Sequence, residues 1–99
     1  MTGRGTGRGP QEPERYEDQL RAGPGGIMTD EVGVITGDVT VVTRSAPDGR
    51  AAIDVQYTGA EEWYTLTGSP APIPPGGLAV LHARVLDLLR RGGCAQAPG

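Results

Sequence analysis

The hydrophobic pattern of this chain changes from strict alternation in the middle to helical spacing near the C-terminus. Residues 51–58 place an apolar side chain at every second position, as expected of a half-buried β-strand. The apolar set is Ile53, Val55 and Tyr57, and the polar set between them is Asp54, Gln56 and Thr58. Residues 62–67 alternate in the same way, with Tyr64 and Leu66 on the apolar face. The polar turn between the two runs predicts an antiparallel hairpin, with both tyrosines in the core.

Two further runs precede this hairpin and extend the predicted sheet. Residues 39–44 are rich in β-branched side chains, which favour a strand, and residues 32–36 form a shorter candidate strand. Gly37 and Asp38 between them fit a two-residue turn, or Gly37 forms a bulge in one longer strand. A turn is also predicted at residues 45–49, which contain Pro, Asp and Gly. The runs therefore predict an antiparallel meander of three or four strands.

One helix is predicted near the C-terminal end of the chain. Residues 69–77 are rich in proline and glycine, so they end the sheet and form an extended crossover. From residue 78 to residue 91 apolar side chains recur at helical spacing, and Gly92 fits the position just after the helix. The apolar stripe consists of Leu78, Leu81, Val85, Leu88 and Leu89. A helix of this kind packed on one face of the meander gives an α+β fold.

Both ends of the chain carry few apolar side chains, which sets the predicted limits of the folded part. We expect residues 1–27 to be a flexible leader rich in Gly, Arg and Pro. Within it, residues 12–22 permit a short helix, because acidic side chains come early and an arginine comes late. Residues 28–92 form the predicted small α+β domain, and residues 93–99 form a disordered tail.

Met28 is a second candidate for the native start of the protein. It follows residues 23–27, whose codons can read as a purine-rich ribosome-binding sequence just upstream of a start codon. The alternative is a Gly/Pro linker, with Met1 as the start. The sequence leaves both interpretations open.

Composition and charge limit the classes of partner. The formal net charge is -3, so a broad basic surface for nucleic acid is absent. Lys, Asn and Phe do not occur, and all nine basic residues are Arg, a bias that indicates a high-GC bacterial genome. The sequence holds no apolar run of membrane-spanning length and no apolar segment after its first arginines of the kind a secretory signal needs. We therefore expect a cytoplasmic protein.

The side chains that most often carry catalysis or bind metals are scarce. The single histidine, His82, is expected on the helix surface, and the single cysteine, Cys94, lies in the predicted tail. These are too few donors for a zinc site. The adjacent carboxylates of Glu61 and Glu62 belong to a turn, where we expect them to point into water rather than across a cleft. The sequence therefore predicts no catalytic, metal-binding or cofactor-binding residue and no enzymatic activity.

Trp63 is the strongest functional candidate in the sequence. Alternation places it on the polar face of residues 62–67, opposite Tyr64. Tryptophan is enriched among the residues that dominate the energetics of protein interfaces. The predicted interaction face consists of Trp63, Val42, Thr40, Gln56 and Thr65. The alternative is that the N-terminal segment or a twist of the sheet covers the indole.

The predicted domain is too small to bury a large core and holds no disulfide, so we expect it to have a partner. We predict a non-enzymatic protein-interaction or regulatory module that acts through a sheet face or edge. It would bind another protein or form a homodimer. One alternative is a nucleic-acid-binding module that uses the Arg/Gly leader. A second alternative is a small-molecule binder or accessory enzyme subunit whose pocket forms only in a dimer.

Overall fold

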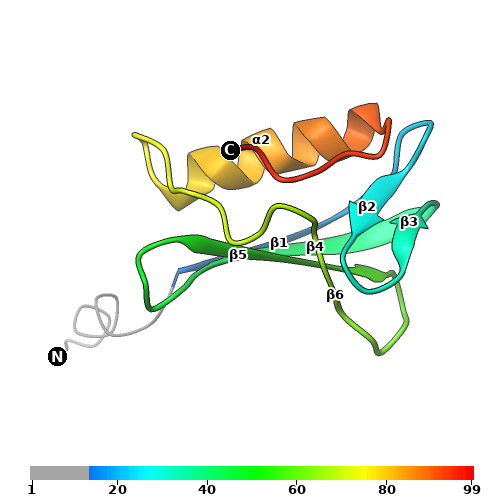
Figure 1. The fold of residues 1–99 in the computed structure, drawn as a ribbon, viewed down its shortest axis with the longest axis horizontal. Helices are drawn as coiled ribbons and strands as arrows, with labels where there is room; N and C mark the ends of the chain where they lie inside the picture. Colours follow the sequence, from blue (N-terminus) through cyan, green and yellow to red (C-terminus); the bar gives the residue numbers. More distant parts are fainter. Residues whose placement is uncertain (1–13) are drawn as a thin grey trace, which may run out of the picture.

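The structure, a computed structural model, describes residues 14–99. Its elements are the strands β1 (Arg15–Arg21), β2 (Ile27–Thr29), β3 (Gly33–Ile35), β4 (Asp38–Ser45), β5 (Ala51–Tyr57) and β6 (Tyr64–Thr65) and the helix α2 (Leu78–Arg91). An antiparallel four-stranded sheet has the order β1-β4-β5-β6, and β2 and β3 form a separate two-stranded sheet. Helix α2 lies along one face of the larger sheet (Figure 1). The predicted α+β class, with an antiparallel sheet and a C-terminal helix on one face, is confirmed.

The hairpin of β4 and β5 is the centre of the sheet and agrees with the alternation in the sequence. Its paired residues on the helix side include Val41 with Val55 and Thr43 with Ile53, all four of them fully buried. The predicted turn closes through a hydrogen bond of 2.7 Å from the Ala46 N–H to the Arg50 carbonyl. The β-branched side chains of β4 and β5 favour these strands because they pack well on a pleated surface that is covered by a helix.

Residues 12–22 were predicted to permit a short helix, and this prediction is wrong for the residues that the structure describes. Residues 15–21 form β1, which pairs with β4 along its whole length. Tyr16 and Leu20 share a face at a spacing of four in a strand as they do in a helix, so the pattern did not distinguish the two. Pairing with the β-branched β4 supplies long-range hydrogen bonds and burial that an isolated short helix cannot match.

The strand predicted at residues 32–36 exists as β3, but its partner differs from the predicted one. β3 pairs with β2 in the small sheet, and not with β4. The hydroxyl of Thr29 stabilises the connecting turn by donating to the Gly33 carbonyl (2.7 Å) and accepting from the Val32 N–H (3.2 Å). Gly37, with φ 88°, lies between β3 and β4, where the chain passes from the small sheet to the large one.

The folded body extends beyond the predicted range of residues 28–92 at both ends. Residues 14–27, expected in the leader, contribute β1 and the start of β2. Residues 93–99, expected to be disordered, run beside β2, and Ala95 forms a parallel bridge with Ile27. The Ala97 N–H also donates to the Thr67 carbonyl (2.9 Å). These backbone contacts hold the C-terminal segment against β2 and against the chain that follows β6, and composition alone does not predict them.

Helix α2 covers the core with a slightly different stripe from the predicted one. Its buried residues are Leu78, Leu81, His82, Val85, Leu86 and Leu89. Leu88, predicted in the stripe, is only half-buried, because the helix is rotated toward β1 and β4, on which it packs. Within residues 14–99 no helix combines the length and apolar character that crossing a lipid bilayer requires.

Candidate functional site

One face of the large sheet points away from α2 and is here called the outer face (Figure 1). The predicted interaction residues of β4, β5 and β6 lie on it. The strand registers align its side chains in rows across the sheet. One row is Glu17, Val42, Asp54 and Thr65, and the next is Gln19, Thr40 and Gln56. The predicted residues Val42, Thr40, Gln56 and Thr65 therefore share one face. Sequence alternation was sufficient to group them.

Trp63 immediately precedes β6 and is 42% exposed. It lines a shallow depression of about 200 Å³ together with Arg15, Val42, Arg44 and Asp54. The indole is thus neither fully covered nor isolated, because it forms one wall of a site whose other walls come from β1, β4 and β5. The structure brings the predicted pair Trp63 and Val42 into this depression, whereas Thr40, Gln56 and Thr65 do not line it.

Two polar residues of the predicted interaction face, Thr40 and Gln56, form hydrogen bonds within the chain. The hydroxyls of Thr40 and Thr58 lie 3.1 Å apart, and Thr40 exposes only 3% of its surface. The Gln56 side-chain amide donates to the Ala60 carbonyl (2.9 Å), which braces the loop that carries Trp63. Thr40 therefore offers a partner almost no contact area, and Gln56 acts on the site through the loop.

Glu31 fixes Thr65 at the far side of the outer face. Its carboxylate accepts a hydrogen bond of 2.7 Å from the Thr65 hydroxyl and another of 2.7 Å from the Thr65 N–H. The hydroxyl bond first, and the backbone bond second, hold the pKa of Glu31 below its ordinary value of 4.5. The two-residue strand β6 is therefore anchored at Thr65 although it is short.

Two arginines give the depression its charge. Arg44 bonds to the Asp54 carboxylate through two nitrogens, each 3.2 Å from Oδ2, and Arg15 pairs with Glu17 at 3.1 Å. The side chains of Arg15 and Arg44 remain 55% and 46% exposed, so guanidinium donors stay available to a partner. Sequence reasoning missed both residues. The parity of Arg44 with Val42 in the same strand was a usable signal, while Arg15 was hidden by the helix interpretation of residues 12–22.

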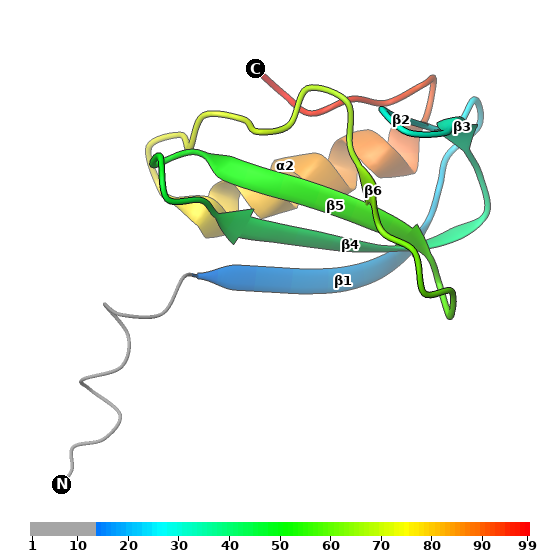
Figure 2. The same cartoon turned by 60° about the horizontal axis from the view of Figure 1, so that its bottom comes forward.

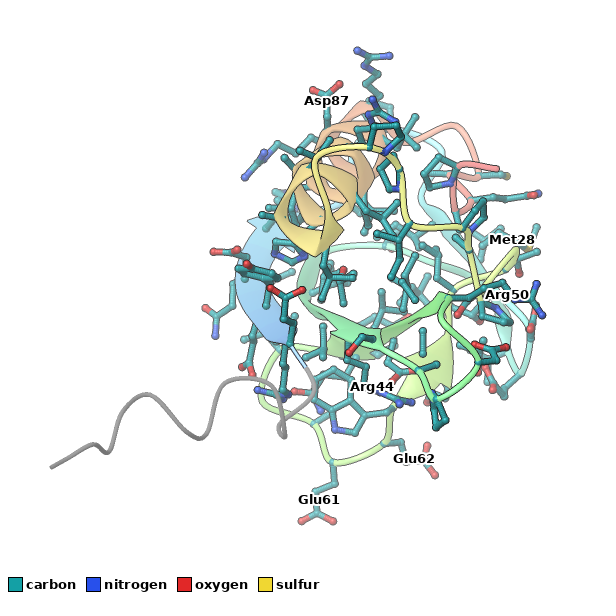
Figure 3. All side chains as sticks on the ribbon, turned by 90° about the vertical axis from the view of Figure 1, so that its left-hand side faces the viewer. Met28, Arg44, Arg50, Glu61, Glu62 and Asp87 are labelled. Carbon is teal, nitrogen blue, oxygen red and sulfur yellow. The ribbon has the colours of Figure 1, made fainter. Side chains whose placement is uncertain are left out.

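The loop between β5 and β6 carries two acidic side chains, Glu61 and Glu62. Figure 3 shows Arg44 on the outer side of the sheet, with Glu61 pointing away from it into solvent. Glu61 and Glu62 are exposed, as the sequence predicted. Glu62 accepts a hydrogen bond of 3.0 Å from the Tyr64 hydroxyl, and this bond, the largest cause, raises the pKa of Tyr64.

The two tyrosines predicted in the core differ in their burial. Tyr64 is half-buried and packs against the core. Tyr57 is 41% exposed, so its assignment to the core is wrong. It is the last residue of β5, and α2 packs on β1 and β4, which leaves this end of β5 uncovered.

His82 was predicted on the helix surface, and this prediction is also wrong, because only 6% of the residue is exposed. Its Nε2 lies 2.8 Å from the Asp18 carboxylate, and its Nδ1 lies 2.8 Å from the Thr43 hydroxyl. A carboxylate only accepts, so Nε2 carries the proton, and in the neutral ring Nδ1 accepts from Thr43. The ring of Tyr16 stacks on the imidazole at a centroid distance of 5.6 Å.

The carboxylate of Asp18, the imidazole of His82 and the hydroxyl of Thr43 are linked in the same order as the three groups of a hydrolase triad. In a hydrolase, however, the hydroxyl is open to the substrate. Thr43 is fully buried in the sheet, so no substrate can reach its hydroxyl in this structure. The positions of Asp18 and His82 in the sequence do not predict their contact, because it depends on the pairing of β1 with β4. The cluster ties α2 to both strands and completes the hydrogen bonding of buried polar groups.

Other reactive groups are dispersed in the part of the chain that the structure describes. No group of three or more His, Cys, Asp or Glu side chains there could hold a metal ion. Cys94 is exposed and unpaired with any other cysteine. The depression beside Trp63 is therefore the site that best joins an apolar anchor to charged groups. In comparisons with known protein families, curated proteins and solved structures, the chain matches none of them.

Proposed function

We propose that the protein is a small cytoplasmic, non-enzymatic module that binds another protein at its outer face, with Trp63 as the anchor. The observation that carries this proposal is the partly exposed indole beside two arginines in one depression. Trp and Arg are the residues most enriched among interface hot spots, and they act best where neighbouring groups exclude water.

The site is prepared for binding because its surroundings are already ordered. The loop that carries Trp63 is braced by Gln56, and β6 is anchored to Glu31. Val42, only 3% exposed, forms a floor that does not need to rearrange. A partner that docks here loses little free energy to ordering of this chain, since ordering costs reduce affinity when an interface is flexible.

The lining also indicates the chemistry of the partner. The lining holds the guanidinium groups of Arg15 and Arg44, each of which pairs with one carboxylate, that of Glu17 or Asp54, and keeps further N–H donors exposed. Each guanidinium group can donate two hydrogen bonds to a carboxylate of the partner, in addition to its own ion pair. The indole and Val42 favour an apolar side chain next to that carboxylate. The proposed partner therefore presents an acidic residue adjacent to an apolar one.

Capture from extracts of the native organism, with the full chain as bait, tests this proposal. We expect a defined protein to be retained by the wild type and lost by Trp63→Ala and by Arg44→Glu. Tyr57→Ala is the matched control, because Tyr57 is as exposed as Trp63 but belongs to the helix-side face. A captured protein that is lost equally from Tyr57→Ala, or retained by Trp63→Ala, would remove the outer face as the binding site.

A further inference from the structure

The two edges of the large sheet differ in their hydrogen bonding. At the β6 edge, Thr65 donates its N–H to Glu31 and accepts from the Asp30 N–H (3.0 Å), so this edge is closed. At the other edge lies β1, and no strand in residues 14–99 pairs with its outer side (Figure 2). β1 is seven residues long, which is long enough to accept another strand.

The backbone groups that β1 presents at this open edge can be assigned. The Glu14 carbonyl accepts from the Ser45 N–H (3.1 Å), and the Ala22 N–H donates to the Gly37 carbonyl (2.9 Å). Both residues thus point their backbone groups toward β4. In an antiparallel ladder this direction alternates along the strand. The unpaired N–H and C=O groups at the open edge therefore belong to Arg15, Glu17, Gln19 and Arg21.

We propose that this edge binds a second copy of the same chain, so that two β1 strands pair antiparallel about a twofold axis at Gln19. In that register Glu17 of each copy lies opposite Arg21 of the other, which forms two equivalent ion pairs. Both side chains are exposed, at 45% and 76%, and their present pairs with Arg15 and Asp38 lie on the same face. The new pairs extend this row of alternating charge.

Charge disfavours the two registers whose axis is shifted toward the N-terminal end of β1, whereas an axis at Leu20 would place Gln19 opposite Arg21 and form no ion pair. An axis at Asp18 would place Asp18 against itself and Arg15 against Arg21. An axis at Glu17 would place two glutamates opposite each other. Like charges directly opposite on neighbouring strands are destabilising. Among the registers with the axis at Glu17, Asp18, Gln19 or Leu20, only the axis at Gln19 places opposite charges against each other.

Helix α2 is compatible with such a dimer. It packs on β1 and β4, so at a strand spacing of about 4.8 Å the helices of two copies would lie about 10 Å apart, a distance at which helices pack. His82 faces β1, and the side of the helix beyond it toward the open edge carries Leu86 and three exposed residues, Ala79, Arg90 and Ala83. The two alanines leave room for the helix of the second copy, while the long Arg90 side chain near the helix end can extend into solvent.

Sedimentation velocity of the full chain over a range of concentrations tests the proposal. We expect the wild type to dimerise, and Glu17→Arg or Arg21→Glu alone to weaken dimerisation about tenfold or more. An equimolar mixture of these two variants should form a heterodimer, because position 17 of each copy then again lies opposite the reverse charge at position 21 of the other. The double variant should recover the homodimer for the same reason.

A second variant tests the backbone contribution. In Gln19→Pro the lost N–H points to the open edge, so pairing with β4 is retained while the second copy is blocked. Circular dichroism should show that this variant remains folded and sedimentation that it is monomeric. Trp63→Ala should dimerise like the wild type, since Trp63 precedes β6 at the opposite edge of the sheet and takes no part in the pairing of β1. A wild type that is monomeric at every concentration, or a dimer that Glu17→Arg and Gln19→Pro leave intact, would overturn the proposal.

Discussion

The imidazole of His82 in α2 is hydrogen-bonded to the carboxylate of Asp18 in β1, which lies 64 positions earlier in the chain, at 2.8 Å. Its other nitrogen bonds to Thr43 in the neighbouring strand β4. One side chain therefore connects the helix to both strands on which it packs. Because the bonds are directional and the imidazole and Thr43 are buried, they fix the position of the helix more narrowly than apolar contacts alone can.

The first prediction concerns this connection. His82→Ala leaves the Thr43 hydroxyl without its partner in the core and removes the ring that stacks on Tyr16. We expect the free energy of unfolding to fall by about 2–4 kcal/mol, from an unsatisfied buried hydroxyl and a new cavity. Urea denaturation monitored by circular dichroism measures this change. Arg84→Ala, at an exposed position of the same helix, should change the free energy by less than about 0.5 kcal/mol. Equal effects of the two substitutions would contradict the role given to His82.

Local pattern was sufficient for the parts of the fold that are specified locally. The alternation in residues 51–58 and the β-branched run in residues 39–44 predicted β5 and β4, and helical spacing predicted α2 with its bounds. β1 was missed because a spacing of four between Tyr16 and Leu20 fits both a strand and a helix. Only the long-range pairing with β4 decides between them, and the sequence does not display that pairing.

The candidate site was predicted only in part, because some of its residues come together only through the pairing of strands. Trp63 and Val42 were placed on one face by parity alone, and they do line one depression. Arg15 could not be added without knowledge that β1 lies beside β4. The burial of His82 was also hidden, because its partners Asp18 and Thr43 come from strands whose adjacency is a tertiary property.

A close approach of two backbones gives the second prediction. Gly92, with φ 76°, follows α2, and a Cβ there would collide with the carbonyl of Pro24 in the loop between β1 and β2. The same approach is fixed by a hydrogen bond of 2.6 Å from the Gly93 N–H to that carbonyl. We expect Gly92→Ala to lower the free energy of unfolding by about 2–5 kcal/mol, from backbone strain and overlap together.

Gly49→Ala is the matched control for this substitution. Gly49 has a similar φ of 84°, but a Cβ added there would meet no atom within 4 Å. Gly49→Ala should therefore lower the free energy of unfolding only through backbone strain, by about 1–2 kcal/mol. Thermal unfolding of both variants separates the two terms. If Gly49→Ala destabilises the protein as much as Gly92→Ala, the close approach does not contribute.

The third prediction concerns Glu31 and acid. Because its pKa is lowered in the folded state, the unfolded chain binds the proton more tightly than the native protein. The contribution of Glu31 to stability is therefore complete above its ordinary pKa of 4.5 and is lost as the pH falls through the lower folded pKa. Thr65→Val removes the hydroxyl that is the largest cause of the shift, so the pKa of Glu31 should rise toward its ordinary value. Titration of the Glu31 carboxyl by nuclear magnetic resonance measures this change.

Thr67→Val provides the control for Thr65→Val. The Thr67 hydroxyl donates to a different carboxylate, that of Asp30, at 2.8 Å. This substitution should leave the pKa of Glu31 unchanged while it removes a similar surface hydrogen bond nearby. A Glu31 titration that is the same in the wild type and in Thr65→Val would show that the threonine hydroxyl does not hold the carboxylate.

The last prediction uses Trp63, the single tryptophan, as a reporter of its own surroundings. Long arginine side chains cover apolar neighbours with their methylene groups while the charged end stays in water. Arg44 lines the depression beside the indole, so Arg44→Ala should expose more of the ring and raise its quenching by acrylamide. Arg84→Ala, at an exposed position of α2, should leave the quenching constant unchanged. Native quenching should be weaker than in the urea-unfolded chain, because Trp63 is 42% exposed in the fold. An Arg44→Ala protein that remains folded and is quenched like the wild type would mean that Arg44 does not shield the indole, and the depression would lose one of its walls.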